Sequence, residues 1–262
     1  MNYECLLFEV KNQIAYVQFN CPKTMNALED KLFQELVQVT DDIEQKEDIK
    51  TIILTGSGKA FCAGGDLRRL EKGFKEPLEG YYYMKNFHPW VLKFSKLEKP
   101  VIAAVNGYAV GAGFCIALLC DVVLASENAI FAQSFSNVGL IPDLAGMYFL
   151  PRMVGPQKAK EMVFTGDKIS ASEAKDLGIV NHVIPDDQLL KEAETLAEKI
   201  ANGPSIAHKF AKEIINLSTE IKLEELLSLE AHAQSICFQT EDHKEAVAAF
   251  MQKRKPNFNR NK

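Results

Sequence analysis

Cysteine and histidine are too scattered in this chain to suggest a metal site or a disulfide framework. The six cysteines include no CxxC pair, and the five histidines include no HxxxH spacing. Structural zinc sites need closely spaced ligands of this kind, and disulfide-stapled domains show a regular cysteine framework. We therefore predict reduced thiols, a cytoplasmic protein and no metal.

Positive charge and long apolar runs are also scarce. The chain has 30 Lys and Arg against 35 Asp and Glu, a formal net charge of -5 at pH 7. Proteins that bind nucleic acids or anionic membranes usually carry a basic excess. The longest apolar run, residues 101–119, is interrupted by Asn106 and three glycines, which is unlike a membrane-spanning helix. We predict neither a nucleic-acid nor a membrane partner.

The sequence does contain an alternation of strand-like and helix-like segments. Apolar runs typical of strands occur at residues 13–19, 51–56, 101–105 and 122–126, with an amphipathic helix between the first two. This alternation predicts an α/β fold with largely parallel pairing. Beyond Pro142 the pattern is mainly helical, with a capping box at Ser170 and Glu173 and predicted helices over residues 186–200, 204–217, 223–238 and 241–251. We therefore divide the chain into a core, residues 1–199, and a helical C-terminal region, residues 200–262.

Two glycine-rich turns are the most informative feature of the chain. FCAGGDL occupies residues 61–67, and NGYAVGAG occupies residues 106–113. Each turn follows a strand-like run and leads into a helix-like one, so each presents backbone N–H groups to an anion. If both turns face one cleft, two N–H donors can hold a carbonyl oxygen that becomes an enolate. One such turn alone would be weak support, because glycine pairs are common in tight turns.

Several motifs in order resemble the enoyl-CoA hydratase/isomerase, or crotonase, superfamily. They are FCAGGDL, KPVIAAVNGYAVGAG, CDVVLAS, FSNVGLIPD, LPRMVG and TGDKISASEAKDLGIVNHVI, which fall between residues 61 and 184. The resemblance itself runs nearly end to end. The resemblance implies a ββα spiral core with a helical C-terminal trimerisation region, assembled as a homotrimer or a hexamer. It also implies acyl-CoA thioester substrates, with coenzyme A as the carrier and no other cofactor. The two enolate-binding N–H groups would be those of Gly65 and Ala112.

The acid/base residues decide the reaction, because they differ between members of the superfamily. Hydratases of the family place two glutamates at positions that hold Cys115 and Phe135 in this chain. The remaining candidate is Asp143, which either caps a helix beginning near Leu144 or acts as the acid/base. FSNVGLIPD resembles the phenylacetate-pathway ring isomerase and 3,2-enoyl-CoA isomerase branch, in which an Asp at this position is catalytic. We therefore predict an isomerase.

We expect Asp143 to work as a single proton shuttle. It would remove a proton next to the thioester carbonyl and return one at C4, which moves the double bond. Burial among Phe135, Leu140 and Met147 is expected to raise the pKa of its carboxyl toward the working pH.

Three alternatives remain open. The first is an enoyl-CoA hydratase. The second is an aryl-CoA dehalogenase or hydrolase, because His88 and Asp143 match the general base and nucleophile of the family's 4-chlorobenzoyl-CoA dehalogenase. The other interpretation of His88 is an ordinary surface histidine. The third is a member that binds CoA thioesters without catalysis, which would have no reason to keep a carboxylate at Asp143.

The coenzyme A site is predicted from the resemblance alone. The family uses backbone around the first turn for the adenine and basic side chains for the phosphates, and Phe250 would approach the adenine in a neighbouring subunit. Asp66 could instead cap the helix that follows the turn. The candidates are Lys23, Ala63, Gly64, Asp66, Leu67, Arg68, Gly111, Phe250 and Lys253.

Overall fold

The larger of two sheets forms the base of the molecule. The computed structural model describes residues 3–258. Six strands lie in the order β1-β2-β3-β5-β7-β10; only β1 and β2 pair antiparallel, and the other neighbours are parallel. Their bounds are β1 Leu6–Lys11, β2 Ile14–Phe19, β3 Thr51–Gly56, β5 Val101–Val105, β7 Val122–Ser126 and β10 His182–Ile184. The runs predicted as strands are therefore confirmed.

A second, smaller sheet brings the two glycine turns together. Its order is β4-β6-β8-β9, with β4 Ala60–Cys62, β6 Tyr108–Val110, β8 Ile130–Ala132 and β9 Lys168–Ser170. The chain adds β3, β5 and β7 to the large sheet and β4, β6 and β8 to the small one in alternation, which makes a spiral. Because β4 and β6 are parallel neighbours, the turns that follow them leave the sheet at the same edge.

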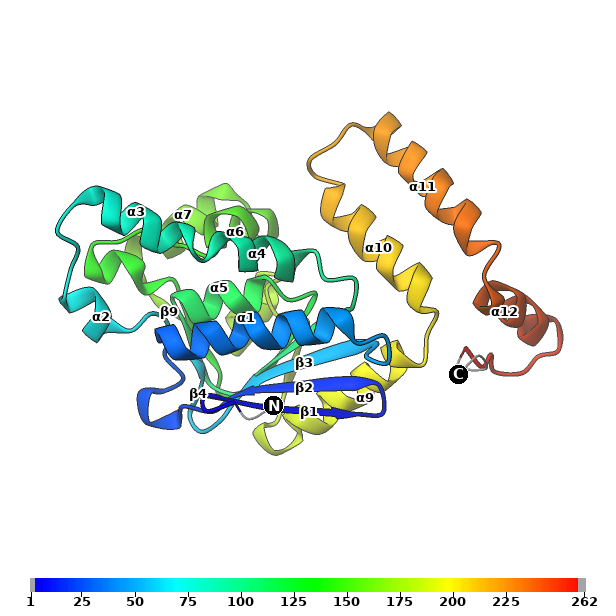
Figure 1. Ribbon diagram of the computed structural model, residues 1–262, viewed down its shortest axis with the longest axis horizontal. Helices are drawn as coiled ribbons and strands as arrows, with labels where there is room; N and C mark the ends of the chain where they lie inside the picture. The colour runs from blue at the N-terminus through cyan, green and yellow to red at the C-terminus, as the bar shows by residue number, and fades with distance from the viewer. Residues whose placement is uncertain (1–2, 259–262) are drawn as a thin grey trace.

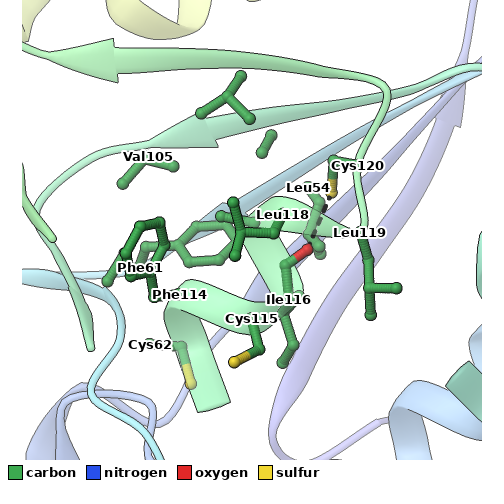
Figure 2. Close-up of a cluster of buried hydrophobic side chains, with 14 of the residues drawn as sticks. Leu54, Phe61, Cys62, Val105, Phe114, Cys115, Ile116, Leu118, Leu119 and Cys120 are labelled. Carbon is green, nitrogen blue, oxygen red and sulfur yellow. Dashed lines mark hydrogen bonds between the residues drawn. The ribbon is translucent and has the colours of Figure 1, made fainter. Parts of the chain in front are cut away.

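Helices cover both faces of the large sheet. On one face, α1 (Asp30–Gln45) packs the buried side chains of Leu32, Leu36 and Ile43 into the main core, and α5 (Ala112–Leu118) is buried along its whole length. Figure 2 shows α5 inside this core, with Phe114 beside Phe61 of β4. On the other face, α9 (Leu189–Ala201) covers a second cluster of strand side chains (Figure 1).

The middle of the chain forms shorter helices, of which α3, α4, α6 and α7 lie above α5 in Figure 1. They are α2 Leu67–Glu71, α3 Pro77–Lys85, α4 His88–Ser95, α6 Gly146–Val154, α7 Pro156–Thr165 and α8 Ala171–Asp176. Three single turns also occur, η1 Pro22–Thr24, η2 Ser134–Val138 and η3 Asp186–Gln188. The capping box predicted at Ser170 and Glu173 is present at the start of α8.

The last three helices extend away from the sheets (Figure 1). They are α10 Ser205–Leu217, α11 Leu223–Cys237 and α12 Glu241–Met251, close to the predicted ranges. Lys212 anchors α10 to the core, because its Nζ lies 2.7 Å from the Asp121 carboxylate. The division proposed between residues 199 and 200 falls in the last turn of α9. Within residues 3–258, no helix combines the length and hydrophobicity that crossing a membrane requires.

Candidate active site

The first glycine turn directs one backbone N–H away from the protein. Gly64 has φ +101°, and a Cβ there would lie 2.9 Å from the carbonyl oxygen of Val110, so only glycine fits. Its carbonyl oxygen accepts the Leu28 N–H at 2.7 Å. Because the peptide unit is planar and trans, the N–H of Gly65 points opposite to that carbonyl. In the described part of the chain this N–H has no acceptor, and Gly65 is exposed.

The second turn presents a matching donor. Gly111 has φ +54°; its N–H donates to Ala132 at 2.9 Å, and its carbonyl accepts the Cys115 N–H at 3.0 Å. Ala112 is the first residue of α5, so its N–H has no acceptor one turn earlier in the helix. No other acceptor takes it up within residues 3–258.

The two turns lie against each other. The Cβ position of Gly64 is 3.7 Å from the backbone nitrogen of Ala112, and a Cβ on Gly113 would collide with the Cys62 carbonyl at 2.0 Å. This close contact is possible only because both turns are built from small residues. Two unpaired N–H groups on adjoining turns can stabilise an oxygen that gains negative charge.

Asp143 lies in the loop between η2 and α6. It does not cap that helix: α6 begins at Gly146, and its N-cap is Ala145, which makes no side-chain capping bond. The carboxyl oxygen Oδ1 is buried and has no hydrogen-bond partner among the described residues. Leu144 (φ 43°) and Ala145 (φ 62°) both adopt the left-handed conformation, which costs energy for residues with a Cβ. A strained loop therefore holds a carboxyl group whose Oδ1 has no hydrogen-bond partner.

Burial raises the pKa of the Asp143 carboxyl from 3.8 to about 6. A raised pKa agrees with the expectation from the sequence. The three side chains that were expected to bury the carboxyl differ in their exposure. Phe135 is buried, whereas the side chains of Leu140 and Met147 are 45% and 51% exposed. Of the three expected residues, only Phe135 is itself buried.

Cys115 and Phe135, at the positions where the sequence resemblance leads us to expect glutamates in a hydratase, both lack a charge. Cys115 is fully buried, and its Sγ lies 3.7 Å from Nε2 of the buried Gln133. Burial, and secondly the charge of Asp143, raise the pKa of this thiol above its ordinary value. The thiol therefore stays protonated at neutral pH. Asp143 is left as the one ionisable oxygen acid of these three positions.

A cavity of about 500 Å³ adjoins the first turn. Two residues of its wall adjoin Gly65, because Leu28 forms a β-bridge with Gly65 and Asp66 follows it in the chain. Tyr83 of α3 lines the cavity as well. Burial raises the pKa of Tyr83, and the charge of Asp143 contributes to the increase. The full lining is Leu28, Glu29, Asp30, Lys31, Asp66, Arg68, Arg69, Lys72 and Tyr83.

The cavity contains basic residues that the sequence did not single out. Arg68 lies 2.7 Å from the Glu29 carboxylate and 3.0 Å from that of Asp66, so its charge is largely neutralised. Arg69 instead stacks over the rings of Phe74 and Tyr83 at 4.7 and 4.9 Å, and no ion pair of the described residues includes it. Arg68 and Arg69, although adjacent in the sequence, thus point from α2 into different surroundings. This difference depends on how α2 is oriented on the protein and is not visible in the sequence.

The other predicted residues are less closely joined to this site. Asp66 caps α2 through the Arg68 N–H, as its alternative interpretation held, and Ala63 follows β4 in the first turn. His88 is exposed at the start of α4, and no described hydrogen bond or ion pair joins it to Asp143. Exposed side chains far apart along the chain make up the rest: Lys23 in η1, Leu67 in α2, Phe250 in α12 and Lys253 after it. No cluster suited to a metal ion occurs among residues 3–258.

Comparisons with known proteins identify the family of the chain. A family model for enoyl-CoA hydratase/isomerase matches residues 9–261. The chain is 38% identical over 250 residues to a probable mitochondrial enoyl-CoA hydratase of Dictyostelium discoideum, which covers 95% of this chain and 89% of the relative. It is 35% identical over 257 residues to 1,2-epoxyphenylacetyl-CoA isomerase of Escherichia coli, with 97% and 98% covered.

Solved structures show the same fold. The enoyl-CoA hydratase/isomerase of Cupriavidus metallidurans CH34 superposes with a TM-score of 0.94 at 33% identity, over 99% of this chain and 97% of that one. The predicted α/β crotonase fold is thereby confirmed. The chain belongs to the enoyl-CoA hydratase/isomerase family.

Proposed function

We propose that this enzyme is an acyl-CoA isomerase that moves a double bond from the 3 to the 2 position, or isomerises a ring-derived acyl-CoA. The observation that carries the proposal is Asp143, a half-buried residue whose carboxyl has a raised pKa and one buried oxygen without a partner. Cys115 and Phe135 leave the two hydratase positions without a carboxylate. Hydratase names are more frequent among the relatives, and one relative is named as an isomerase.

The proposed chemistry needs one base and two donors. The Asp143 carboxylate takes a proton from C2, and the electron pair of that C–H bond moves into the thioester as a dienolate. The N–H groups of Gly65 and Ala112 hold the oxygen that gains the charge. The protonated Asp143 then gives the proton to C4, and the double bond closes between C2 and C3. No atom is gained or lost, and the carboxylate is restored.

The alternatives fit the site less well. Hydration adds water across the double bond, and activating a positioned water with a single carboxylate leaves one proton transfer without a second polar group. Dehalogenation would need His88 as a base, and this residue is exposed at the start of α4. A binder without catalysis would gain nothing from a buried, unpartnered acid, because such a group costs free energy.

Assembly and carrier binding extend the proposal. We infer that the chain forms a homotrimer or a hexamer. The region of α11 and α12 exposes several large apolar side chains, and monomeric proteins rarely expose a large apolar patch to water. These side chains include Leu227, Ile236, Phe238, Phe250 and Met251. The coenzyme A part of the substrate would lie along the cavity beside the first turn, where Arg69 and Lys72 add positive charge to the predicted set.

Two substrates distinguish the proposed reaction from hydration. Isomerisation of 3-hexenoyl-CoA creates a conjugated enoyl thioester and raises the ultraviolet absorbance, whereas hydration of crotonyl-CoA destroys conjugation and lowers it. We expect rapid conversion of 3-hexenoyl-CoA and little change with crotonyl-CoA. Faster hydration of crotonyl-CoA than isomerisation of 3-hexenoyl-CoA would contradict the proposal, because it would require a water-activating group besides Asp143.

The pH dependence of the reaction follows from the buried acid. Asp143 must be ionised in the free enzyme to act as a base, and burial raises its pKa to about 6. We therefore expect kcat/KM for 3-hexenoyl-CoA to fall about tenfold for each pH unit below about pH 6 and to level off above it. The measurement is a pH–rate profile from pH 4.5 to 8.5. Activity that stays constant down to pH 4.5 would show that an exposed carboxylate of ordinary pKa, or none, is the base.

A further inference from the structure

Asn26 is a buried polar residue whose side chain is fully used. It is 0% exposed and has φ 55°, a left-handed conformation that asparagine tolerates better than most residues. Its Oδ1 accepts the Cys21 N–H at 2.9 Å. Its Nδ2 donates to the carbonyl oxygens of Ser57 at 3.0 Å and Ala60 at 2.7 Å. One side chain thus joins three backbone positions.

These bonds clamp the approach to the first glycine turn. Ser57 follows β3, and Ala60 begins β4, so Nδ2 of Asn26 holds both ends of the loop between the two strands. β4 runs directly into the turn that carries Gly65. The segment around Asn26 therefore fixes where that turn starts.

The main chain on either side of Asn26 grips the turn itself. The Met25 carbonyl accepts the Ala63 N–H at 3.0 Å, and the Leu28 N–H donates to the Gly64 carbonyl at 2.7 Å. The second bond sets the plane of the peptide that joins Gly64 to Gly65, and hence the direction of the Gly65 N–H. No other hydrogen bond of residues 3–258 holds the Gly64 carbonyl.

We propose that Asn26 is a positioning residue that keeps the Gly65 N–H aimed at the thioester oxygen, acting through the Leu28 N–H. The inference rests on the proposed role of Gly65 as an oxyanion donor. Donors of this kind act because they are preorganised, so a small misdirection costs rate and not fold. Asn26 does not touch the substrate; its effect passes through the backbone from residue 26 to residue 28.

The variant Asn26→Asp tests the proposal with little change in size. It keeps an acceptor for the Cys21 N–H but replaces the NH₂ group with an oxygen that faces two carbonyl oxygens. We expect kcat for 3-hexenoyl-CoA to fall about 10- to 100-fold, while KM and the Kd of free coenzyme A stay within about twofold. A protonated carboxyl can still donate one bond, so kcat should fall further as the pH rises and this proton is lost.

Thr51→Val is the matched control. Thr51 is also 0% exposed, and its hydroxyl donates to the Pro100 carbonyl at 3.0 Å. It is the first residue of β3, at the opposite end of the strand from Ser57. This variant loses one buried hydrogen bond and should keep the parental kcat. If Asn26→Asp and Thr51→Val show the same kcat, the positioning role is wrong. A loss of coenzyme A binding as large as the loss of kcat would also overturn it.

A readout without turnover separates the inference from the proposed function. The infrared carbonyl band of bound butyryl-CoA, labelled with ¹³C at the thioester carbon, should shift to lower frequency in the parent enzyme and less in Asn26→Asp. Equal shifts in both would overturn the role of Asn26 and leave the oxyanion donors standing. No shift in the parent enzyme would contradict the role of Gly65 and Ala112 as oxyanion donors, and the proposed role of Asn26 would fail with it.

Discussion

Asp143→Asn is expected to lower kcat for 3-hexenoyl-CoA by about 10³-fold, within the range of about 10²–10⁴ for loss of a general acid/base. The amide has nearly the same shape as the carboxyl but can neither take the C2 proton nor return one at C4. Binding of acyl-CoA should persist, because the Gly65 and Ala112 N–H groups are unchanged. The measurement is the steady-state rate at pH 7.5 together with the Kd of butyryl-CoA.

The same substitution should make the protein more stable. The folded chain binds this proton more tightly than the unfolded chain, because burial raises the pKa of Asp143 from 3.8 to about 6. The resulting contribution to stability is present below about pH 4 and is lost as the pH rises through 6. At pH 7.5 the buried carboxylate therefore costs up to about 3 kcal/mol, at about 1.4 kcal/mol for each tenfold change in proton binding.

Denaturant unfolding at pH 7.5 and pH 4 checks this second effect. We expect Asp143→Asn to be the more stable protein at pH 7.5 and to lose that advantage near pH 4. Asp48→Asn, at an exposed acid after α1, is the control and should change neither kcat nor stability. Parental activity in Asp143→Asn would contradict the proposed mechanism. If Asp143→Asn were less stable than the parent at pH 7.5, the carboxylate would have a stabilising partner in the folded protein.

The features that the sequence predicts well are those with a local cause. The strand runs have the right length and composition, and the capping box at Ser170 and Glu173 forms between residues three apart. The glycine turns were also located from sequence, because Gly64 and Gly111 need backbone conformations that other residues avoid. The sequence does not predict that the two turns meet. The strands that bring them together, β4 and β6, have only three residues each, which is too short for a recognisable periodic pattern.

The features that the sequence misses depend on contacts distant along the chain. Arg68 was selected for its charge, but its carboxylate partner Glu29 lies 39 residues away. Asn26 is buried because its side chain bonds to the loop between β3 and β4, more than 30 residues further along the chain. The helix expected near Leu144 begins at Gly146 because Leu144 and Ala145 adopt left-handed conformations.

The scaffold and the reaction have separate determinants in this family. In our proposal the backbone N–H groups of the two turns form the part that any enolate chemistry can use, and only proline at position 112 would lack this N–H. In the proposed mechanism Asp143 supplies the acid/base group, and Cys115 and Phe135 supply none. The fold and the turns therefore identify the family, while Cys115, Phe135 and Asp143 decide which reaction we propose.

Ala112→Pro is a direct test of the second oxyanion donor. Ala112 is the first residue of α5, the helix position where proline is best tolerated, because its N–H has no intrahelical acceptor and its φ is already helical. Proline also restricts the residue before it, excluding the α region. Gly111 has φ 54° and ψ -122°, outside that region and without a Cβ to clash. The substitution therefore removes one N–H with little disturbance of the helix.

We expect Ala112→Pro to lower kcat by about 10²–10³-fold, the usual cost of one oxyanion donor. The matched control is Ala112→Gly, which keeps the N–H and removes only a methyl group, so its kcat should stay within a few-fold of the parent. Circular dichroism and the Kd of free coenzyme A report whether α5 and the carrier site are intact. A folded Ala112→Pro enzyme with near-parental kcat would show that the thioester oxygen does not bind at the start of α5, because no proline N–H exists to hold it.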